Sequence, residues 1–266
     1  MQKLFTPRKL EEITKPNITK KWITFWLIKK DNTIYKSIDF SDYLNEFETK
    51  QTKRILNNQA ALDFAITRTQ VKLILARYNQ LTAIKEINFQ YGTYGKPSFG
   101  QLAFNLTHGE NYSLLAITNL KTIGIDLEKI TQRPWEKTHA RFFRQEEMAE
   151  LLKIDKRTRL TSFYTLWVRK EAVLKAVGSH ILDGLKKTSA HTDKEKYRVR
   201  LYNKNGEYDS TWLCPVKLNS DFIWSYAINN AEIDLNQTNQ NKIDIKTIYA
   251  LDDNDNWPEL SYFYLQ

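Results

Sequence analysis

Two short acidic segments constrain this chain more than any other feature. Residues 124–128 read Gly-Ile-Asp-Leu-Glu, and residues 167–175 read Trp-Val-Arg-Lys-Glu-Ala-Val-Leu-Lys. In an extended strand alternate side chains share a face, so Asp126 and Glu128 point the same way. In a helix positions i and i+4 are neighbours, so Glu171 and Lys175 share a face. The sequence predicts that this strand and this helix meet and bring three carboxylates and one ammonium together.

Such a cluster has the composition of a divalent-metal site beside a phosphate. Carboxylate oxygens are ligands that Mg²⁺ prefers, and a lysine neutralises phosphate oxygens. The simpler interpretation is a strand with two solvated acids and a surface Glu171–Lys175 pair worth about 0.3–0.5 kcal/mol. Against it, Ile123, Ile125 and Leu127 bury one face and crowd both carboxylates onto the other. A neighbouring lysine could compensate the two acids, but a metal is the sharper hypothesis.

The composition is that of a folded, basic protein. The chain has 266 residues, 41% of them hydrophobic and 13% aromatic, enough for one large domain or two small ones. The net charge of +9 predicts an anionic partner, which could be a nucleic acid, an acidic protein or a phosphorylated small molecule. The single cysteine, Cys214, and the polar first 21 residues predict a cytoplasmic protein without a secretion signal. The longest apolar run, residues 22–28, is too short to span a membrane.

Hydrophobic periodicity predicts two successive series of strands and helices. We therefore expect an α+β fold of two similar halves, residues 1–115 and 116–231, followed by a polar extension over residues 232–266. No sequence repeat relates the two halves. Strands are expected over residues 21–28, 84–90, 112–118, 122–128, 197–202, 212–218 and 222–228, and helices over 42–57, 60–78, 145–153 and 160–177, the last ending at Gly178.

Further motifs complete the pattern. Gly95-Lys96-Pro97, Phe104-Asn105-Leu106-Thr107-His108 and Phe142-Phe143 accompany the two acidic segments. With these motifs the chain resembles the 4′-phosphopantetheinyl transferases over about residues 20–230. Within that superfamily it resembles the larger, surfactin-synthetase-activating type, whose fold is a single-chain pseudo-dimer of two α+β halves. The resemblance implies transfer of the 4′-phosphopantetheine arm of coenzyme A to a serine hydroxyl of an apo carrier protein, with release of adenosine 3′,5′-bisphosphate.

The resemblance also implies roles for individual residues. Asp126, Glu128 and Glu171 would hold Mg²⁺, with Mn²⁺ as an alternative metal, and Lys175 would contact the transferring phosphate. Glu171, or a water that it orients, would be the base for the serine proton, with Glu147 as a second candidate. The phosphates of coenzyme A would be held by Lys96, Thr107, His108 and Lys175, and by a looser match also by Arg54, Thr67 and Arg68.

The chain departs from the family pattern at a few positions. Thr107 stands where serine is usual, which keeps the hydroxyl, and His108 is followed by Gly109-Glu110 rather than by a small hydroxyl residue. Leu127 between the two strand acids leaves a coordination position for water. Of these departures, the Gly109-Glu110 pair bears on the phosphate pocket.

The implied partners are coenzyme A, bound between the halves of a monomer, and an acidic acyl or peptidyl carrier protein. Neither a nucleic acid nor a membrane is expected as a partner. Two alternatives remain: a non-catalytic module that binds coenzyme A or a carrier protein, and a metal-dependent nuclease. The nuclease fits the net charge, but Lys129 is adjacent to Glu128, whereas restriction-type nucleases place the lysine two residues further along the strand.

Overall fold

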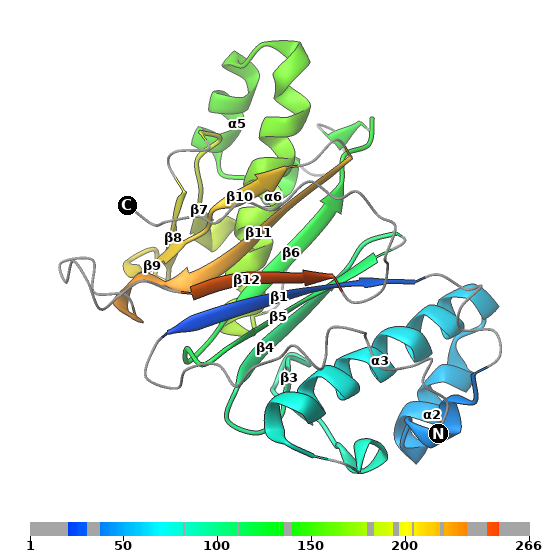
Figure 1. Ribbon diagram of the computed structural model, residues 1–266. Helices are drawn as coiled ribbons and strands as arrows, with labels where there is room; N and C mark the ends of the chain where they lie inside the picture. The colour runs from blue at the N-terminus through cyan, green and yellow to red at the C-terminus, as the bar shows by residue number, and fades with distance from the viewer. Residues whose placement is uncertain are drawn as a thin grey trace.

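The computed structural model is an α+β protein in which two mainly antiparallel sheets pack face to face and helices cover their outer faces (Figure 1). The structure describes residues 21–249 apart from 31–37, 82, 111, 133, 136–139, 180–183, 194–196, 204, 219–220 and 233–243. Among these residues no helix is both long and apolar enough to cross a membrane.

The first sheet has four strands in the order β12-β1-β5-β4. Helix α3 packs on its outer face, where Trp26 of β1 and Leu115 of β5 meet Ile66 and Ile74 of the helix. A reciprocal pair of hydrogen bonds between Asn45 and Glu48 caps the preceding helix, α2. The elements of this part are β1 (Trp22–Lys29), α2 (Glu46–Arg54), α3 (Asn58–Asn79), the short ribbon β2 (Gln90–Tyr91) and β3 (Pro97–Ser98), β4 (Ala103–His108), β5 (Tyr112–Thr118) and β12 (Asp244–Tyr249).

The second sheet runs β10-β11-β9-β8-β7, and β6 pairs with β11 on its other side. The long helix α6 lies across its outer face, and α5 packs against α6 (Figure 1). Aromatic rings fill this core, with Phe163 stacked on Trp135 and edge-on to Phe143. The elements are β6 (Gly124–Lys129), α5 (Gln145–Lys153), α6 (Lys156–Val177), β7 (Thr188–Ser189), β8 (Arg198–Tyr202), β9 (Tyr208–Leu213), β10 (Val216–Leu218) and β11 (Phe222–Asn229).

The inner faces of the two sheets form a third core. Phe25 of β1 lies 5.0 Å, between ring centroids, from both Trp224 and Tyr226 of β11. A polar bond also joins the sheets, because the Asn105 side chain of β4 accepts a hydrogen bond from the backbone of Ile125 in β6 at 2.9 Å. The strand with the two acids is therefore held on its inner side by the first sheet and on its outer side by α6.

Most predicted elements are present, with two exceptions. Residues 84–89 do not form the expected strand, and residue 90 begins the short β2. A 3₁₀ turn occupies Ile84–Glu86, and its Lys85 carbonyl accepts a hydrogen bond from the buried Lys72. The expected strand 212–218 is split into β9 and β10 at Pro215, which lacks the N–H a continuous ladder requires. Helix α6 begins four residues early because Asp155 caps it.

The division into halves stays a prediction, since the expected boundary after residue 115 falls inside β5. The extension over residues 232–266 is more than an appendage, because its β12 pairs in parallel with β1, from Trp22 opposite Asp244 to Leu27 opposite Tyr249. The sequence also predicts that the largely apolar and aromatic residues 260–265 dock on the core, but they lie outside the described residues.

We predict that β12 protects an edge. Deleting residues 233–266 would leave β1, an apolar strand, as a bare sheet edge, and such edges pair with other chains. The truncated protein should self-associate at micromolar concentrations in sedimentation-velocity experiments. A matched deletion of residues 250–266 keeps β12 and should sediment like the full chain. Equal sedimentation of the two truncations would contradict this role of β12.

Candidate active site

Helix α6 lies against β6 at a point where no side chain separates them. A Cβ atom built on Gly124 would lie 1.9 Å from the carbonyl oxygen of Ala172 and 2.3 Å from the amide nitrogen of Ala176. Any larger residue would therefore push the helix away from the strand. This contact brings the acidic and basic side chains of the last two turns of α6 next to the carboxylates of β6.

Asp126, Lys175 and Thr107 meet at this contact. The Lys175 ammonium donates to Asp126 Oδ1 at 2.6 Å and to Thr107 Oγ1 at 3.2 Å, while the Thr107 hydroxyl donates to the same carboxylate oxygen at 3.3 Å. Burial opposes the charge on Lys175, but Asp126, and then the other two acids of the cluster, outweigh it and raise the pKa of the ammonium. Lys175 therefore stays charged and forms an ion pair with Asp126 of β6.

The other two acids lie around this pair. Glu171 is 4% exposed, and burial raises the pKa of its carboxyl to about 8, with Asp126 and Glu128 adding to the shift and Lys175 opposing it. Glu128 accepts a hydrogen bond from the indole of Trp167 at 3.1 Å. Asp126 and Glu128 are thus close enough to Glu171 to act on it electrostatically, while the convergence of all three acids on one ion stays a prediction.

The donor set suits a hard divalent cation. Asp126 Oδ2 is buried without a hydrogen-bond partner, and so is the hydroxyl of Ser225, which stands opposite Asp126 in the pairing of β6 with β11. Partnerless buried oxygens are rare, and a bound ion or water is a common explanation for them. Within the described part of the chain, however, no three His, Cys, Asp or Glu side chains already converge as metal ligands. Sequence reasoning missed Ser225, because only strand pairing places it opposite Asp126.

His108 lies at the end of β4 among cations. Its Nδ1 is 3.0 Å from the hydroxyl of Ser113, which is 3.3 Å from the hydroxyl of Thr67. Although part of His108 is exposed, packing around the ring, with further contributions from Lys30, Lys175 and Arg68, lowers its pKa to about 4. The ring is therefore neutral at pH 7 and interacts with its neighbours through hydrogen bonds rather than through charge.

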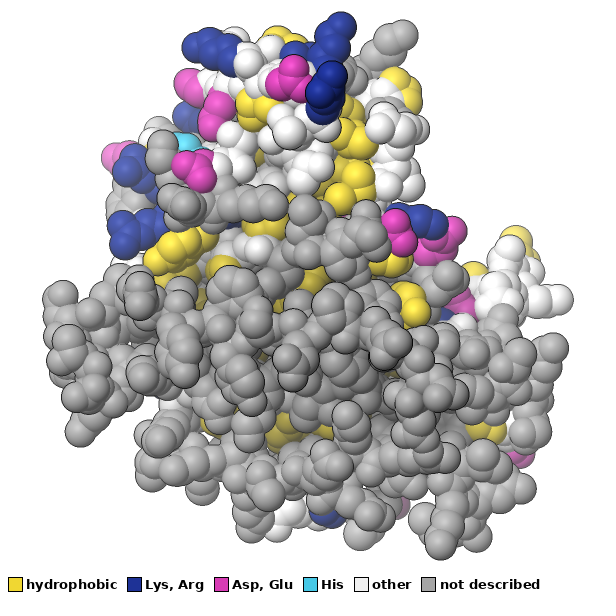
Figure 2. All heavy atoms as spheres, turned by 45° about the horizontal axis from the view of Figure 1, so that its top comes forward, with side chains coloured by type: hydrophobic (Ala, Val, Ile, Leu, Met, Phe, Trp, Pro, Cys, Tyr) yellow, Lys and Arg dark blue, Asp and Glu magenta, His cyan; other side chains and the backbone are white. Residues whose placement is uncertain are grey.

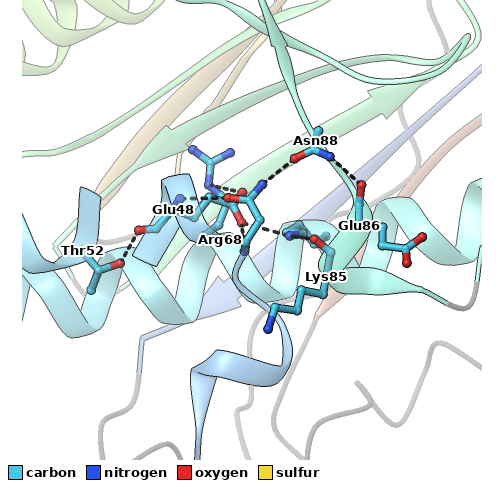
Figure 3. Close-up of polar contacts among 8 residues, drawn as sticks. Glu48, Thr52, Arg68, Lys85, Glu86 and Asn88 are labelled. Carbon is cyan, nitrogen blue, oxygen red and sulfur yellow. Dashed lines mark hydrogen bonds and ion pairs between the residues drawn. The ribbon is translucent and has the colours of Figure 1, made fainter. Parts of the chain in front are cut away.

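Arg68 belongs to a second cluster, which joins α2 to α3 (Figure 3). Its guanidinium lies 3.6 Å from Glu48 and 4.8 Å from the ring centre of Phe89. Glu48 also accepts hydrogen bonds from the fully buried Lys72 at 2.9 Å and from the backbone of Asn45 at 3.0 Å. Arg68, which is predicted to contact a phosphate, is thus already held by the carboxylate of Glu48 and the ring of Phe89.

Arg54 is not brought into the site. It ends α2 with an exposed side chain, and it contacts none of the other predicted residues in the part of the chain described. Its predicted contact with a coenzyme A phosphate therefore has no geometric support, whereas Thr67 is linked to His108 through Ser113.

Glu147, the second candidate for the base, lies in a structural position, and its role as a base stays a prediction. Its carboxylate is buried and accepts hydrogen bonds from Lys170 at 2.5 Å and from the backbone amides of Arg144 and Ala190 at 2.9 Å. Both of its oxygens are therefore engaged in hydrogen bonds within the protein. The arrangement repeats that of Glu48: an acid three residues into a short helix caps that helix and pairs with a buried lysine of the next one.

Lys96 also differs from its prediction as a phosphate ligand. Its ammonium donates to the carbonyl oxygens of Ala176 at 2.6 Å and Ile123 at 3.0 Å and to the hydroxyl of Thr122 at 3.2 Å. Burial lowers the pKa of this ammonium to about 8. A lysine has three N–H donors, and all three are used here within the protein.

Comparison with known proteins gives consistent findings. A family model described as the 4′-phosphopantetheinyl transferase superfamily matches residues 122–227, a range that includes both acidic segments. The chain is similar to the Synechocystis protein named putative 4′-phosphopantetheinyl transferase slr0495, with 30% identity over 180 residues, covering 65% of this chain and 72% of that protein. It is 30% identical over 177 residues to 4′-phosphopantetheinyl transferase HetI of Nostoc, covering 62% and 73% of the two chains. It is 29% identical over 142 residues to 4′-phosphopantetheinyl transferase Sfp of Bacillus subtilis, which covers 52% of this chain and 62% of that protein.

The contact at Gly124 can be tested by adding one methyl group. Gly124→Ala should lower the free energy of unfolding by about 1–3 kcal/mol or more, because the Cβ overlaps helix backbone that cannot move independently of the site. Urea unfolding followed by circular dichroism measures the change. Gly92→Ala is the control, since its Cβ would meet ordinary contact distances of 3.7 Å. Equal stability of the two variants would refute the close-packing argument.

A second prediction concerns pH and Glu171. The pKa of this carboxyl is 4.5 in its ordinary state and about 8 in the folded chain, so between these values the folded state binds more protons than the unfolded state. Stability contributed by the protonated acid is therefore lost as pH rises through this window. Glu171→Gln cannot titrate, so its stability does not fall in this way. With a chelator present, its free energy of unfolding relative to that of the wild type should rise by on the order of 2–4 kcal/mol from pH 5 to pH 9.

Thermal unfolding across this pH range measures the difference. Glu146→Gln, which changes an acid whose side chain is 76% exposed, is the control and should run parallel to the wild type. If Glu171→Gln also runs parallel to the wild type, the buried acid does not titrate as described.

Proposed function

The chain belongs to the 4′-phosphopantetheinyl transferase superfamily, and we propose that Asp126, Glu128, Glu171 and Lys175 carry the family's reaction in it. The protein transfers the 4′-phosphopantetheine arm of coenzyme A to carrier proteins. In this reaction the serine oxygen bonds to the phosphorus next to the pantetheine arm. The bond from that phosphorus to the bridging oxygen breaks, the serine proton passes to a base, and adenosine 3′,5′-bisphosphate leaves.

The observation that carries the assignment is the pairing of Lys175 with Asp126 and Thr107. This pairing uses two of the three ammonium donors and leaves one for a phosphate oxygen. The lysine side chain keeps 25% of its surface exposed, so a ligand can reach it. A positive charge fixed in a largely buried site stabilises negative charge as it develops on the transferring phosphoryl group and the leaving group.

Glu171 is the proposed base, acting directly or through a water that it orients. Its raised pKa, about 8, lies near the working pH, where a general base takes a proton most effectively. A cation beside it would favour the ionised form that the base role requires. Glu147 is not proposed as a base, because its carboxylate is fully engaged with Lys170 and two backbone amides.

Mg²⁺ is the proposed metal, with Mn²⁺ as an alternative, and Asp126, Glu128 and Glu171 would hold it. When bound, it would offset the negative charge of the diphosphate. The partnerless Oδ2 of Asp126 and the hard oxygen donors of all three acids support this choice. Thr107 and His108 would add hydrogen bonds to coenzyme A phosphates, with the neutral imidazole donating through Nε2 while Nδ1 faces Ser113.

The proposed partner is an acidic carrier protein that meets a monomeric, cytoplasmic enzyme. The net charge of +9 would speed the encounter in a salt-dependent way. Figure 2 shows basic side chains interspersed with acidic ones at the end of the molecule formed by α5 and α6. We therefore expect the attraction to come from the charge of the whole chain rather than from one patch at that end.

Intact-protein mass spectrometry tests the proposed reaction. Apo acyl and peptidyl carrier proteins incubated with this protein, coenzyme A and Mg²⁺ should each gain about 340 Da, one phosphopantetheine arm, and EDTA should prevent the gain. Coenzyme A binding without any mass gain would favour the binding module instead. Gain in the presence of EDTA would remove the metal from the proposal while keeping the transfer.

Substitution of Lys175 separates its role from general charge effects. Lys175→Met should lower kcat about 100-fold while changing KM for coenzyme A less, because the lysine acts most strongly on the transition state. Lys129→Met, which removes an exposed lysine of β6 paired with Glu110, is the control and should keep kcat. A KM effect of Lys175→Met with unchanged kcat would show that this lysine only binds the substrate.

A further inference from the structure

The ammonium of Lys96 bonds the start of β6 to the end of α6. Two of its three acceptors, Thr122 and Ile123, lie just before β6, and the third is the carbonyl of Ala176, one residue after Lys175. The Thr122 hydroxyl donates to the same Ala176 carbonyl at 2.8 Å. Two donors from outside the helix thus hold one carbonyl of its last turn.

The end of α6 is a place where such donors matter. The last carbonyls of a helix have no partner within it and carry its partial negative charge, which a cation stabilises. Gly178 ends α6 in the left-handed conformation, with φ of 63°, and its amide bonds back to Leu174. Lys96 therefore donates to the carbonyl of Ala176, which the amide of Gly178 does not reach.

Backbone hydrogen bonds hold the turn that carries Lys96. Gly95 adopts a φ of 79°, and the backbone of Gly92 both donates to the Lys96 carbonyl and accepts from Gly95, each at 2.9 Å. The Gly-Lys-Pro sequence thus forms a rigid turn from which the lysine reaches across to the helix. A tight turn is what the sequence motif predicts, but its direction toward α6 is visible only in the structure.

We propose that Lys96 is a positioning residue, which holds the last turn of α6 and thereby keeps Lys175 against Asp126 and Thr107. The inference rests on the proposed function, since it assigns to Lys96 an effect on Lys175 rather than a contact with coenzyme A. The clamped carbonyl belongs to Ala176, the residue directly after Lys175. A displacement of about 1 Å at such a position can cost a hundredfold in rate.

A second lysine offers a matched control. Lys96 and Lys121 both line a pocket of about 660 Å³ between the Gly-Lys-Pro turn and the end of α6. The Lys121 ammonium makes no hydrogen bond among the described residues, while its backbone amide bonds to Glu232. Lys121→Met therefore removes the same charge from the same pocket without releasing the helix.

The kinetic test compares Lys96→Met, Lys96→Arg and Lys121→Met in phosphopantetheine transfer. Lys96→Met should lower kcat tenfold or more, with KM for coenzyme A changed less than about threefold. Lys96→Arg, which can still donate to the carbonyls, should recover most of the loss, and Lys121→Met should keep kcat. In a Lys175→Met background, Lys96→Met should lower kcat no further, because the residue it positions is gone.

Two kinetic results would overturn the inference. A rise in KM with kcat unchanged, shared by Lys96→Met and Lys121→Met, would mean that the pocket lysines only attract the anionic substrate. Additive losses of kcat in the double variant with Lys175→Met would mean that Lys96 acts independently of Lys175.

Hydrogen exchange gives a readout that does not require transfer. Lys96→Met should speed amide exchange at residues 174–179 and leave the first half of α6 unchanged, and Thr122→Val should do the same to a smaller degree. Unchanged exchange at residues 174–179 in both variants would overturn the inference. If the wild type transfers nothing to any carrier protein, the proposed function fails, and exchange still decides the role of Lys96. Should Lys96→Met fail to fold, Thr122→Val and Lys96→Arg decide it.

Discussion

The direct contact between the backbones of β6 and α6 at Gly124 is the constraint on which the site depends. Aspartate and glutamate have short side chains, and hydrogen bonds to them extend little beyond 3 Å. The helix must therefore lie close to the strand for Lys175 to reach Asp126 at 2.6 Å. A glycine permits this separation, since a Cβ at that point would lie 1.9 Å from helix backbone. Glycine here serves close approach rather than an unusual φ.

Buried ion pairs also join the helices within each part of the chain. In both parts of the chain a helix of nine residues precedes one of 22 residues, and an acid of the short helix pairs with a buried lysine of the long one. The pairs are Glu48–Lys72 and Glu147–Lys170, at 2.9 Å and 2.5 Å. Breaking such a pair is costly, because it leaves one charge buried alone. The same arrangement thus occurs twice, while the likeness of the two halves as a whole stays a prediction. Of the two long helices, α6 carries an acid and a lysine into the candidate site.

Several basic residues of the motifs serve the structure rather than a ligand. Lys170 pairs with Glu147, Lys96 clamps the end of α6, and Arg169 donates to the backbone oxygens of Cys214, His191 and Asp193. The phosphate contact predicted for Lys96 from its residue type therefore has no support from these hydrogen bonds. A side chain's type defines what it can bond to, whereas its direction follows from the turn or helix that carries it. A lysine has a long apolar stem and three N–H donors, so it can either bond within the protein or bind a ligand.

The sequence by itself determined the local structure and the type of chemistry. The period of two around Asp126 and Glu128 and the i,i+4 spacing of Glu171 and Lys175 predicted a strand and a helix that each present charge on one face, and both elements are present. These patterns involve residues only a few positions apart, so they can be recognised in the sequence alone. Only the tertiary structure decided which charges meet: Lys175 with Asp126 rather than Glu171, Ser225 opposite Asp126, β12 beside β1, and Lys96 on the carbonyls of α6. Those contacts join residues far apart in the chain, and they follow from strand pairing and close packing, which no local pattern encodes.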